Sequence, residues 1–304
     1  MTEILLAAYN GEKYLRAQLD SILAQTLSDW HLTVSDDGSS DSTPSILDEY
    51  AARFPRQIRR VFPPRRFGSA KEHFFWLMRQ SDADYLLFSD QDDVWHPDKL
   101  QLFTQSLREA ERESGKDTPV LVFSDLRPVD EELRPIAESL AEYQNMNVAE
   151  PDWRGILLSN VVTGCACGVN RALALLAAPP ETDGIIMHDW WLAAVAARFG
   201  RLVFVPERTV DYRQHGDNSV GAKDVRSARY LARKLARLSS VRELAVRKKR
   251  QAAAFRQAYA SRLSPEDAAF LAAFTKPHSG PLFYLRHRRL IRGLPRLAGM
   301  MVLG

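Results

Sequence analysis

The regular alternation of strand-like and helix-like segments in the first 125 residues constrains the fold most strongly. Five short runs of branched and aromatic residues predict strands at Glu3–Ala8, His31–Ser35, Ile58–Phe62, Tyr85–Phe88 and Val120–Phe123. The segments between them carry apolar residues at helical spacing, and two of these helices are expected to start at prolines 44 and 97. Strands separated by helices of this length predict an α/β fold with a doubly wound, mostly parallel sheet.

The remainder of the chain is less regular. A strand is expected over Thr163–Val169, a helix from near Asp189, and a further strand over Leu202–Val205. Beyond Gly221 the pattern becomes helical, and Ser264 is expected to cap a helix start. We therefore predict one domain over residues 1–221, in two halves of residues 1–125 and 126–221, followed by a C-terminal helical extension over residues 222–304.

Charge is distributed unevenly along the chain. The net charge is +3, but residues 222–304 contain 19 lysines and arginines against 4 aspartates and glutamates. Residues 1–221 contain 22 basic residues against 34 acidic ones, so the body is acidic and the extension is basic. Such an asymmetry suggests that the two parts meet different partners.

Two cysteines and the absence of a long apolar run bear on the compartment. Cys165 and Cys167 are expected to share one face of a strand and to stay reduced, although a metal-binding pair is the alternative. The sequence contains no run of about 18 apolar residues, so no membrane-spanning helix is expected. The first residues do not resemble a signal peptide. These features together predict a cytoplasmic protein.

Polar clusters follow the first, second and fourth predicted strands. They are Tyr9-Asn10, Asp36-Asp37 and Asp90-Gln91-Asp92. In a doubly wound sheet these strand ends share one edge, where ligands bind. Asp36 has two interpretations, because "SDDGSSDST" is typical of a turn and helix cap but a carboxylate there can also accept the imide N–H of uracil or thymine. Its position at the same edge as Asp90 favours nucleotide binding.

Three carboxylates stand within four positions at residues 90–93 and would repel one another without a positive charge. A calcium loop counted from Asp90 would need glycine and glutamate where Trp95 and Gln101 stand, which excludes that motif. One or two carboxylates together with substrate phosphates suit Mg²⁺ or Mn²⁺. The cluster therefore predicts one of these cations.

Six blocks in order resemble the family-2 glycosyltransferases with the GT-A fold, which is Rossmann-like. They are "ILLAAYNGEKYL", "VSDDGSSDST", "FSDQDDVWHPDKL", "TGCACGVNRAL", "HDWWLAAVAARFG" and "YRQHGDNSVG". The combination is most similar to the bacterial rhamnosyltransferase branch, whose donor is dTDP-L-rhamnose. The resemblance covers residues 3–221 and implies a nucleotide-sugar-binding half over 1–125 and an acceptor and catalytic half over 126–221. One departure is His73, where the family pattern has asparagine.

The resemblance implies a role for each matching position. The residues implied for the nucleotide sugar are Ala8, Tyr9, Asn10, Asp36, Lys71, Asp90, Gln91 and Arg213. Those implied for the metal are Asp92 as the main ligand of the DXD motif, with Asp90 and His215. Asp189 takes the position of the catalytic base, where a helix dipole favours its ionised form and makes it a modest base. Trp190 and Trp191 are expected either to pack in the core or to stack on the acceptor sugar.

The basic extension also has two interpretations. The arginines at 229, 233 and 237 and the basic run at residues 247–250 form either a solvated helix face or a cationic surface for anionic lipid. The lipid surface would also include the apolar residues 282–285, Ile291, Leu294 and 300–303. No nucleic-acid recognition module accompanies the charge. An acceptor on a lipid carrier would favour peripheral contact with the inner face of the cell membrane.

The sequence thus predicts an inverting, metal-dependent transfer of a sugar, L-rhamnose from dTDP-L-rhamnose, to a saccharide acceptor that is lipid-linked, in bacterial cell-surface polysaccharide synthesis. Alternatives are a UDP-sugar donor, a sugar nucleotidyltransferase and a non-catalytic binding module. The nucleotidyltransferase would need a glycine-rich, basic loop after the first strand, which residues 8–11 do not supply.

Overall fold

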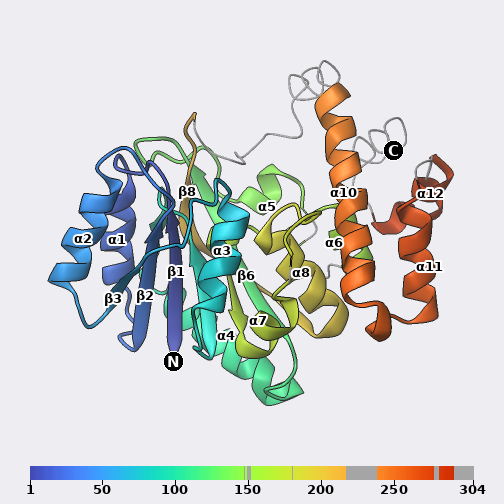
Figure 1. The fold of residues 1–304 in the computed structure, drawn as a ribbon, viewed down its shortest axis with the longest axis horizontal. Coiled ribbons are helices and arrows are strands. Elements are labelled where there is room, and N and C mark those ends of the chain that lie inside the picture. The colour runs from blue at the N-terminus through green and yellow to red at the C-terminus, as the bar shows by residue number, and fades with distance from the viewer. Residues whose placement is uncertain (147, 149–151, 180, 217–237, 277–280, 291–304) are drawn as a thin grey trace.

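The structure, a computed structural model, describes residues 1–146, 148, 152–179, 181–216, 238–276 and 281–290 (Figure 1). Its eight strands are β1 (Thr2–Ala8), β2 (Trp30–Asp36), β3 (Ile58–Val61), β4 (Tyr85–Ser89), β5 (Val94–Trp95), β6 (Val120–Val129), β7 (Cys167–Asn170) and β8 (Arg201–Arg213). They form one sheet in the order β3-β2-β1-β4-β7-β6-β8-β5.

The helices connect these strands or follow them. They are α1 (Leu15–Leu23), α2 (Thr43–Arg53), α3 (Ala70–Arg79), α4 (Lys99–Ser114), α5 (Leu140–Tyr143), α6 (Trp153–Leu158), α7 (Arg171–Ala177), α8 (His188–Phe199), α10 (Leu238–Ala258), α11 (Pro265–Phe274) and α12 (Pro281–Arg286). Short 3-10 turns cover Gly164–Ala166, Ala260–Arg262 and Arg288–Leu290.

The sheet is mostly parallel, as predicted. Strands β3, β2, β1 and β4 run parallel, β6 and β8 pair in parallel, and β7 and β5 are antiparallel to their neighbours. Strand β1 pairs with β2 on one side and β4 on the other, so the strand order reverses there. Ligands bind at the carboxyl ends of strands beside such a point. These ends lie toward the top of Figure 1.

Hydrophobic residues on both faces of the sheet explain its double layer of helices. Along β1, Leu5 packs in one apolar cluster while Ile4 and Leu6 pack in the other, because alternate side chains point to opposite faces. The first cluster includes side chains of α3, α6, α7 and α8, and the second includes those of α1, α2 and α4. Both faces are therefore buried, as a parallel sheet requires.

The segment around the cysteines differs from the prediction. Only Cys167–Asn170 is a strand, because Gly164–Ala166 forms a 3-10 turn in front of it. Cys165 and Cys167 consequently join different apolar clusters, so the expectation that they share one strand face is wrong. Both are buried and free, with no disulfide between them.

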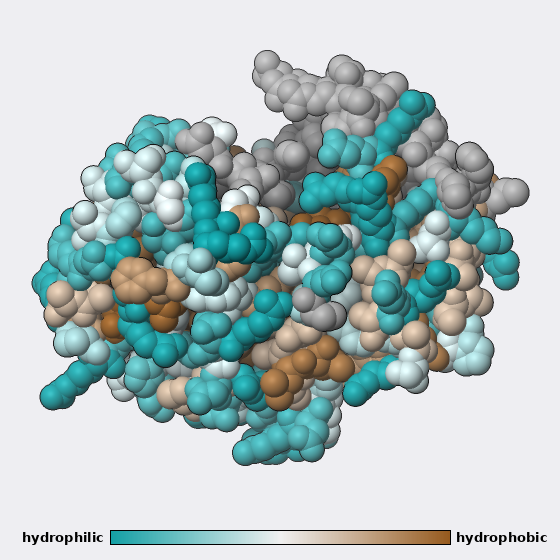
Figure 2. Space-filling view, viewed as in Figure 1, coloured by the Kyte–Doolittle hydropathy of each residue, from teal (hydrophilic) through white to brown (hydrophobic). Residues whose placement is uncertain are grey.

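The described part of the C-terminal region packs against the body. Phe255 of α10 and Phe270 of α11 belong to the same apolar cluster as α6 and α8, and Trp153 stacks on Phe255 with a centroid distance of 5.9 Å. Ser264 caps α11 as predicted, accepting a hydrogen bond from the Asp267 backbone N–H at 3.2 Å. Figure 2 shows hydrophilic side chains over much of the outward face of α10.

Ion pairs reinforce this contact. The buried carboxylate of Asp267 pairs with Arg154 of α6 at 2.8 Å and with Arg198 of α8 at 2.6 Å. Within the described ranges, no helix has both the length and the apolar character needed to cross a membrane. The predicted lipid-facing residues 229, 233, 237, 291, 294 and 300–303 lie outside the described residues.

Candidate active site

A cleft of about 760 Å³ opens at the carboxyl ends of β1 and β4. Tyr9 and Asn10 after β1, and Asp90, Gln91 and Asp92 after β4, line one part of it. Helix α3, the turn at 163–164, the start of α8 and residues 215–216 after β8 line the rest, including Asp189 and His215. The structure therefore brings the predicted residues after β1 and β4 together with Asp189 and His215 in one cavity.

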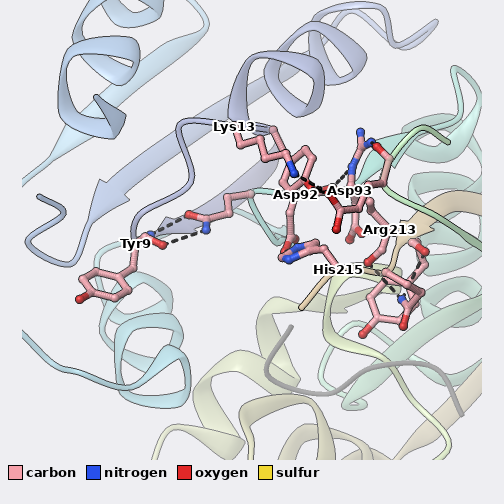
Figure 3. Close-up of polar contacts among 11 residues, drawn as sticks. Tyr9, Lys13, Asp92, Asp93, Arg213 and His215 are labelled. Carbon is pink, nitrogen blue, oxygen red and sulfur yellow. Dashed lines mark hydrogen bonds and ion pairs between the residues drawn. The ribbon is translucent and has the colours of Figure 1, made fainter. Parts of the chain in front are cut away.

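Two acidic residues after β4, Asp90 and Asp92, line this cleft, and Figure 3 shows Asp92 close to His215. Asp92 Oδ2 lies 2.8 Å from His215 Nε2, although 123 residues separate them in the chain. Burial raises the pKa of Asp90 to about 7, and the charges of Asp92 and Asp189 add to that increase. A bound cation would stabilise the ionised carboxylates, because its positive charge offsets both the burial and the repulsion between neighbouring negative charges.

Asp93 is completely buried behind them and was not among the predicted metal ligands. Its Oδ1 accepts a hydrogen bond from the Arg213 backbone N–H at 3.1 Å, while Oδ2 has no partner among the described residues. Oxygen or sulfur atoms of Asp90, Asp93 and Cys165 all lie within 4.8 Å of one another. The donor set of carboxylates and an imidazole beside an unpartnered carboxylate oxygen fits a divalent cation such as Mn²⁺ or Mg²⁺.

Lys99 supplies positive charge from within the protein, a feature that the sequence interpretation missed. This first residue of α4 is fully buried, and its ammonium lies 3.7 Å from the centroid of the Trp95 ring and donates to the Cys165 carbonyl. Burial lowers the pKa of Lys99 to about 8, while Cys165 and the nearby carboxylates Asp93 and Asp90 oppose that shift. The block "VWHPDKL" contains the only signal for it, a lysine at a helix start beside a tryptophan.

Arg213 is the last residue of β8, and His215 stands two residues after it. Arg213 is buried, and its Nε donates to the Asp92 carbonyl at 2.8 Å while its guanidinium lies 4.6 Å from the Tyr14 ring. His215 lies 4.9 Å from the same ring. Arg213 thus connects the Asp92 loop to the end of β8, and His215 is the one that lines the cleft.

Two charged residues at the cleft wall were also missed. Lys13 Nζ pairs with Glu131 Oε2 at 2.5 Å, and Tyr14 Oη donates to the same carboxylate at 3.0 Å. All three line the cleft, and Figure 3 shows Lys13 among them. Lys13 stands in the quoted block "ILLAAYNGEKYL", but its partner lies after β6, and no local pattern predicts that contact.

On the nucleotide side, the loops after β1 and β4 are joined by a side-chain amide. Gln91 accepts from the Tyr9 backbone N–H at 2.7 Å and donates to the Tyr9 carbonyl at 2.9 Å. The Tyr9 ring is exposed, with the Arg66 guanidinium 4.7 Å from its centroid and an Arg66–Tyr9 hydroxyl hydrogen bond of 2.5 Å. Arg66 lines the cleft and extends the predicted set.

Asp36 adopts the turn alternative. Its Oδ2 accepts hydrogen bonds from the backbone N–H groups of Gly38 and Ser39 at 3.1 and 3.0 Å, and it is not among the cleft-lining residues. The neighbouring Asp37 lines the cleft instead, and its carboxylate holds Phe67 and Gly68 through their backbone N–H groups at 2.6 and 2.7 Å. A contact of Asp36 with the base stays a prediction.

Three other predicted residues lie away from the cleft lining. Lys71 Nζ donates to the carbonyls of Thr182 and Ile185 at 2.9 and 3.0 Å. Trp190 and Trp191 are buried in the core, where their indole N–H groups donate to the backbone carbonyls of α6 and α7. The core-packing alternative therefore describes both tryptophans, and neither is proposed to stack on the acceptor sugar.

Asp189 is buried at the start of α8 and lines the cleft. Its Oδ1 accepts from the Trp190 backbone N–H at 2.6 Å, and its Oδ2 accepts from Asn160 Nδ2 at 3.3 Å. Burial raises the pKa of Asp189 to about 7, even though these hydrogen bonds oppose the shift. Desolvation thus outweighs the helix dipole on which the sequence interpretation relied, and Asp189 is a stronger base than expected.

His188 precedes Asp189 and also lines the cleft. Its ring lies 4.3 Å from Phe74 and 5.1 Å from Phe88 between centroids, and burial lowers its pKa to about 3. A Cβ atom at Gly164 would lie only 3.0 Å from His188 Nε2, so the turn passes close to this imidazole. His188 is therefore neutral at physiological pH and sits beside the base.

Comparison with known families decides the class of this site. The model of glycosyl transferase family 2 matches residues 3–169, which is more than half of the chain. The chain belongs to glycosyl transferase family 2. Members of this family transfer sugars, so the protein is a glycosyltransferase, and the predicted resemblance is confirmed.

Curated relatives agree with this family. The dTDP-rhamnosyl transferase RfbG of Shigella flexneri is 27% identical over 230 residues, which cover 74% of this chain and 76% of that protein. A glucosyltransferase of Escherichia coli, WfgD, whose name gives UDP-Glc as donor, is 26% identical over 102 residues, covering 34% of this chain and 39% of that protein.

Solved structures share the fold. Residues 1–349 of Staphylococcus aureus TarS in complex with UDP-GlcNAc match with a TM-score of 0.58 and 14% identity, covering 99% of this chain and 90% of that one. A Pyrobaculum calidifontis mannosyltransferase in complex with GDP-Man and Mn²⁺ matches with a TM-score of 0.56 and 17% identity, covering 98% of this chain and 77% of that one. The likeness confirms the GT-A architecture predicted from the sequence.

Proposed function

We propose that the protein is an inverting, metal-dependent glycosyltransferase that moves L-rhamnose from dTDP-L-rhamnose to a saccharide acceptor. One observation carries the proposal: a single cleft contains the Asp90, Asp92 and His215 side chains together with Asp189, a buried carboxylate with a pKa of about 7. A cation site and a neutral-pH base in one cavity are what a single displacement at a sugar carbon requires.

The rhamnose donor is supported by similarity to a relative named as a dTDP-rhamnosyl transferase over three quarters of the chain. A UDP-sugar donor is the second candidate, since the name of a more partial relative gives UDP-Glc. In either case Tyr9 offers an exposed aromatic ring at the cleft for stacking on the base, and Arg66 adds a positive charge beside it.

Asp92 and His215, with Asp90, would hold Mn²⁺ or Mg²⁺, which when bound supplies neutralisation of the nucleoside diphosphate as it leaves. Asp189 accepts the proton of the acceptor hydroxyl while the new bond to the anomeric carbon forms. The bond from that carbon to the diphosphate oxygen breaks on the opposite face, so the configuration inverts. One displacement needs no nucleophilic side chain.

The acceptor, in this proposal, is a saccharide on a lipid carrier in bacterial cell-surface polysaccharide synthesis, and the protein sits on the inner face of the cell membrane. Support comes from α10, where Arg242, Val246 and Arg250 are exposed. Exposed arginines beside an exposed aliphatic side chain suit anionic headgroups.

Donor turnover tests the enzymatic proposal. The protein is incubated with Mn²⁺ and dTDP-L-rhamnose, UDP-glucose or UDP-GlcNAc, and released nucleoside diphosphate is measured. Release of more dTDP than UDP supports dTDP-L-rhamnose as the donor. Release of more UDP than dTDP identifies a UDP-sugar as the donor instead. Exchange of pyrophosphate, or no release with any donor, contradicts transfer.

Vesicle sedimentation tests the membrane contact. We expect binding to vesicles that contain phosphatidylglycerol and loss of binding in 0.5 M NaCl, by screening. The double variant Arg242→Ala/Arg250→Ala should bind more weakly than the wild type. Equal binding to neutral phosphatidylcholine vesicles would contradict an electrostatic contact.

A further inference from the structure

The segment that leads into α8 is held from two distant parts of the chain. Residues 181–187 precede α8, and Asp189 is the second residue of that helix. From α3, Lys71 Nζ donates to the carbonyls of Thr182 and Ile185 at 2.9 and 3.0 Å. In Figure 1, α3 lies on one side of α8 and α10 on the other. The backbone of residues 181–187, which leads to Asp189, is therefore held by contacts on both sides.

Helix α10 makes the second set of contacts. Gln251 Oε1 accepts from the Ile186 backbone N–H at 2.8 Å, and Arg247 Nη2 donates to the Ile186 carbonyl at 3.5 Å. Gly184 has a φ of +82°, and a Cβ atom there would lie 3.4 Å from the Arg250 carbonyl oxygen. The turn before α8 thus passes against the α10 backbone, and its positive φ at residue 184 favours a glycine there.

The same helix also reaches the other segment that contacts the base. Lys248 Nζ donates to the carbonyl of Leu158, the last residue of α6, at 2.6 Å. Two residues later, Asn160 Nδ2 donates to Asp189 Oδ2 at 3.3 Å and to the Val162 carbonyl at 2.7 Å. Both segments that determine where the Asp189 carboxylate lies are consequently bonded to one turn of α10.

The chemistry of Gln251 argues against a role in packing alone. Its side chain is completely buried, and its amide Nε2 has no hydrogen-bond partner among the described residues. An unpartnered buried N–H costs stability that an apolar side chain of similar volume would avoid. The presence of a glutamine here is explained if its oxygen is needed to accept the hydrogen bond from the Ile186 N–H.

We propose that α10 positions the catalytic base, with Gln251 and Lys248 as positioning residues and Lys71 holding the same segment from α3. The inference rests on the proposed role of Asp189. A general base must lie within hydrogen-bonding distance of the proton that it removes, and a misplacement of about 1 Å can cost on the order of 10²-fold in rate. Helix α10 therefore supports the base from a part of the chain beyond residue 169, where the family match ends.

The test compares two glutamines on one helix. Gln251→Met removes the acceptor oxygen and keeps the side-chain length, and Gln257→Met makes the same change at an exposed position of α10. Binding of dTDP and Mn²⁺, measured by titration calorimetry, gives the fraction of each protein that is competent to bind. We expect kcat per competent site to fall about tenfold in Gln251→Met, with the donor KM unchanged within about twofold.

Two further variants distinguish positioning from folding. Gln251→Glu keeps an oxygen that can accept from Ile186, so kcat should recover toward the wild-type value. Lys71→Met, on the opposite side of the segment, should lower kcat in the same manner even if Gln251→Met does not fold. If both methionine variants match Gln257→Met in kcat per competent site, the inference is wrong. A wild-type protein that turns over no donor would instead overturn the proposed function.

Discussion

The two walls of the cleft are held together in different ways. On the nucleotide side, the Gln91 side chain forms hydrogen bonds with the backbone N–H and carbonyl of Tyr9. Gln91 follows β4 and Tyr9 follows β1, and these two strands are neighbours in the sheet. On the base side, Asp189 depends on Asn160 and, through the backbone, on Lys248 and Gln251. The first wall follows from strand order, whereas the second requires three segments far apart in the chain. Variants of the two walls should accordingly fail in different kinetic parameters.

Removal of the base should produce the largest effect. Asp189→Asn is expected to lower kcat for transfer by about 10²–10⁴-fold, the usual contribution of general base catalysis. Binding of dTDP with Mn²⁺, measured by calorimetry, should be unchanged, because the opposite wall is intact. Transfer at the wild-type rate would remove Asp189 from its proposed role, and lost nucleotide binding would mean that the walls are not separable.

Asp92→Asn probes the nucleotide and metal wall. We expect kcat/KM for the donor to fall by about 10²–10³-fold, since the charge that holds the cation against the diphosphate is lost. Both Mn²⁺ and nucleotide should bind more weakly in calorimetry, in contrast with Asp189→Asn. The matched control Asp98→Asn changes an aspartate near the start of α4 and should leave turnover unchanged. Full metal-dependent activity of the Asp92 variant would contradict the ligand assignment.

The pH dependence sharpens the comparison on the base wall. Because burial raises the pKa of Asp189 to about 7, its carboxylate is protonated and inactive below that pH. Transfer should therefore rise with pH through about 7 and lose about tenfold for each unit below it. A rate that is constant from pH 5 to 8 at saturating substrates would indicate that a group with the ordinary pKa of aspartate acts as base.

Asn160→Leu should have a smaller effect. Its hydrogen bond to Asp189 lowers the pKa of that carboxyl, so its loss should move the rise in kcat to higher pH. At pH 8 the rate should fall by only a few fold, and stability should fall by about 1 kcal/mol, the usual value of one hydrogen bond. Rates measured from pH 6 to 9 give the midpoint, and a shift to lower pH would contradict this contact.

How much of the molecule the sequence predicts depends on the range of the interactions. Strands such as Tyr85–Ser89 and the cap at Ser264 follow from local pattern, and the structure has both. The motifs after β1 and β4 meet because parallel strands end at one edge. Lys99 and Glu131 were missed, since nothing near them in the sequence shows that one lies beneath the carboxylates and the other faces Lys13.

The same limit explains why the sequence left the place of the two tryptophans open and gave Asp189 too low a pKa. A tryptophan pair beside a base resembles a sugar platform, but whether Trp190 faces solvent depends on α6, which covers it through the Ile156 carbonyl. The ordinary dipole argument for Asp189 considered its own helix only, whereas its pKa is set by the segments that bury it. Sequence proximity supplies neither kind of information.

Divalent cation binding should give the smallest effect, a shift in thermal stability. Burial raises the pKa of Asp90 to about 7. The free energy of unfolding of the cation-free protein should therefore fall as pH rises from about 4 to 7, because Asp90 must ionise while buried. Saturating Mn²⁺ should therefore raise the melting temperature more at pH 8 than at pH 6, by a few degrees. Scanning calorimetry with and without EDTA measures this difference, and an equal shift at both pH values would contradict it.

The shared carboxylate of Asp267 has a consequence for protein engineering. Two arginines, one from α6 and one from α8, both depend on it, and their guanidinium groups are mostly shielded from water. A fragment cut before α11 would remove the carboxylate that pairs with both cations and would expose the apolar cluster that Phe270 and Phe274 of α11 join. Chimeras that aim to exchange acceptor preference between relatives should therefore transplant residues 152–276 as one block instead of joining the donor half to a foreign tail.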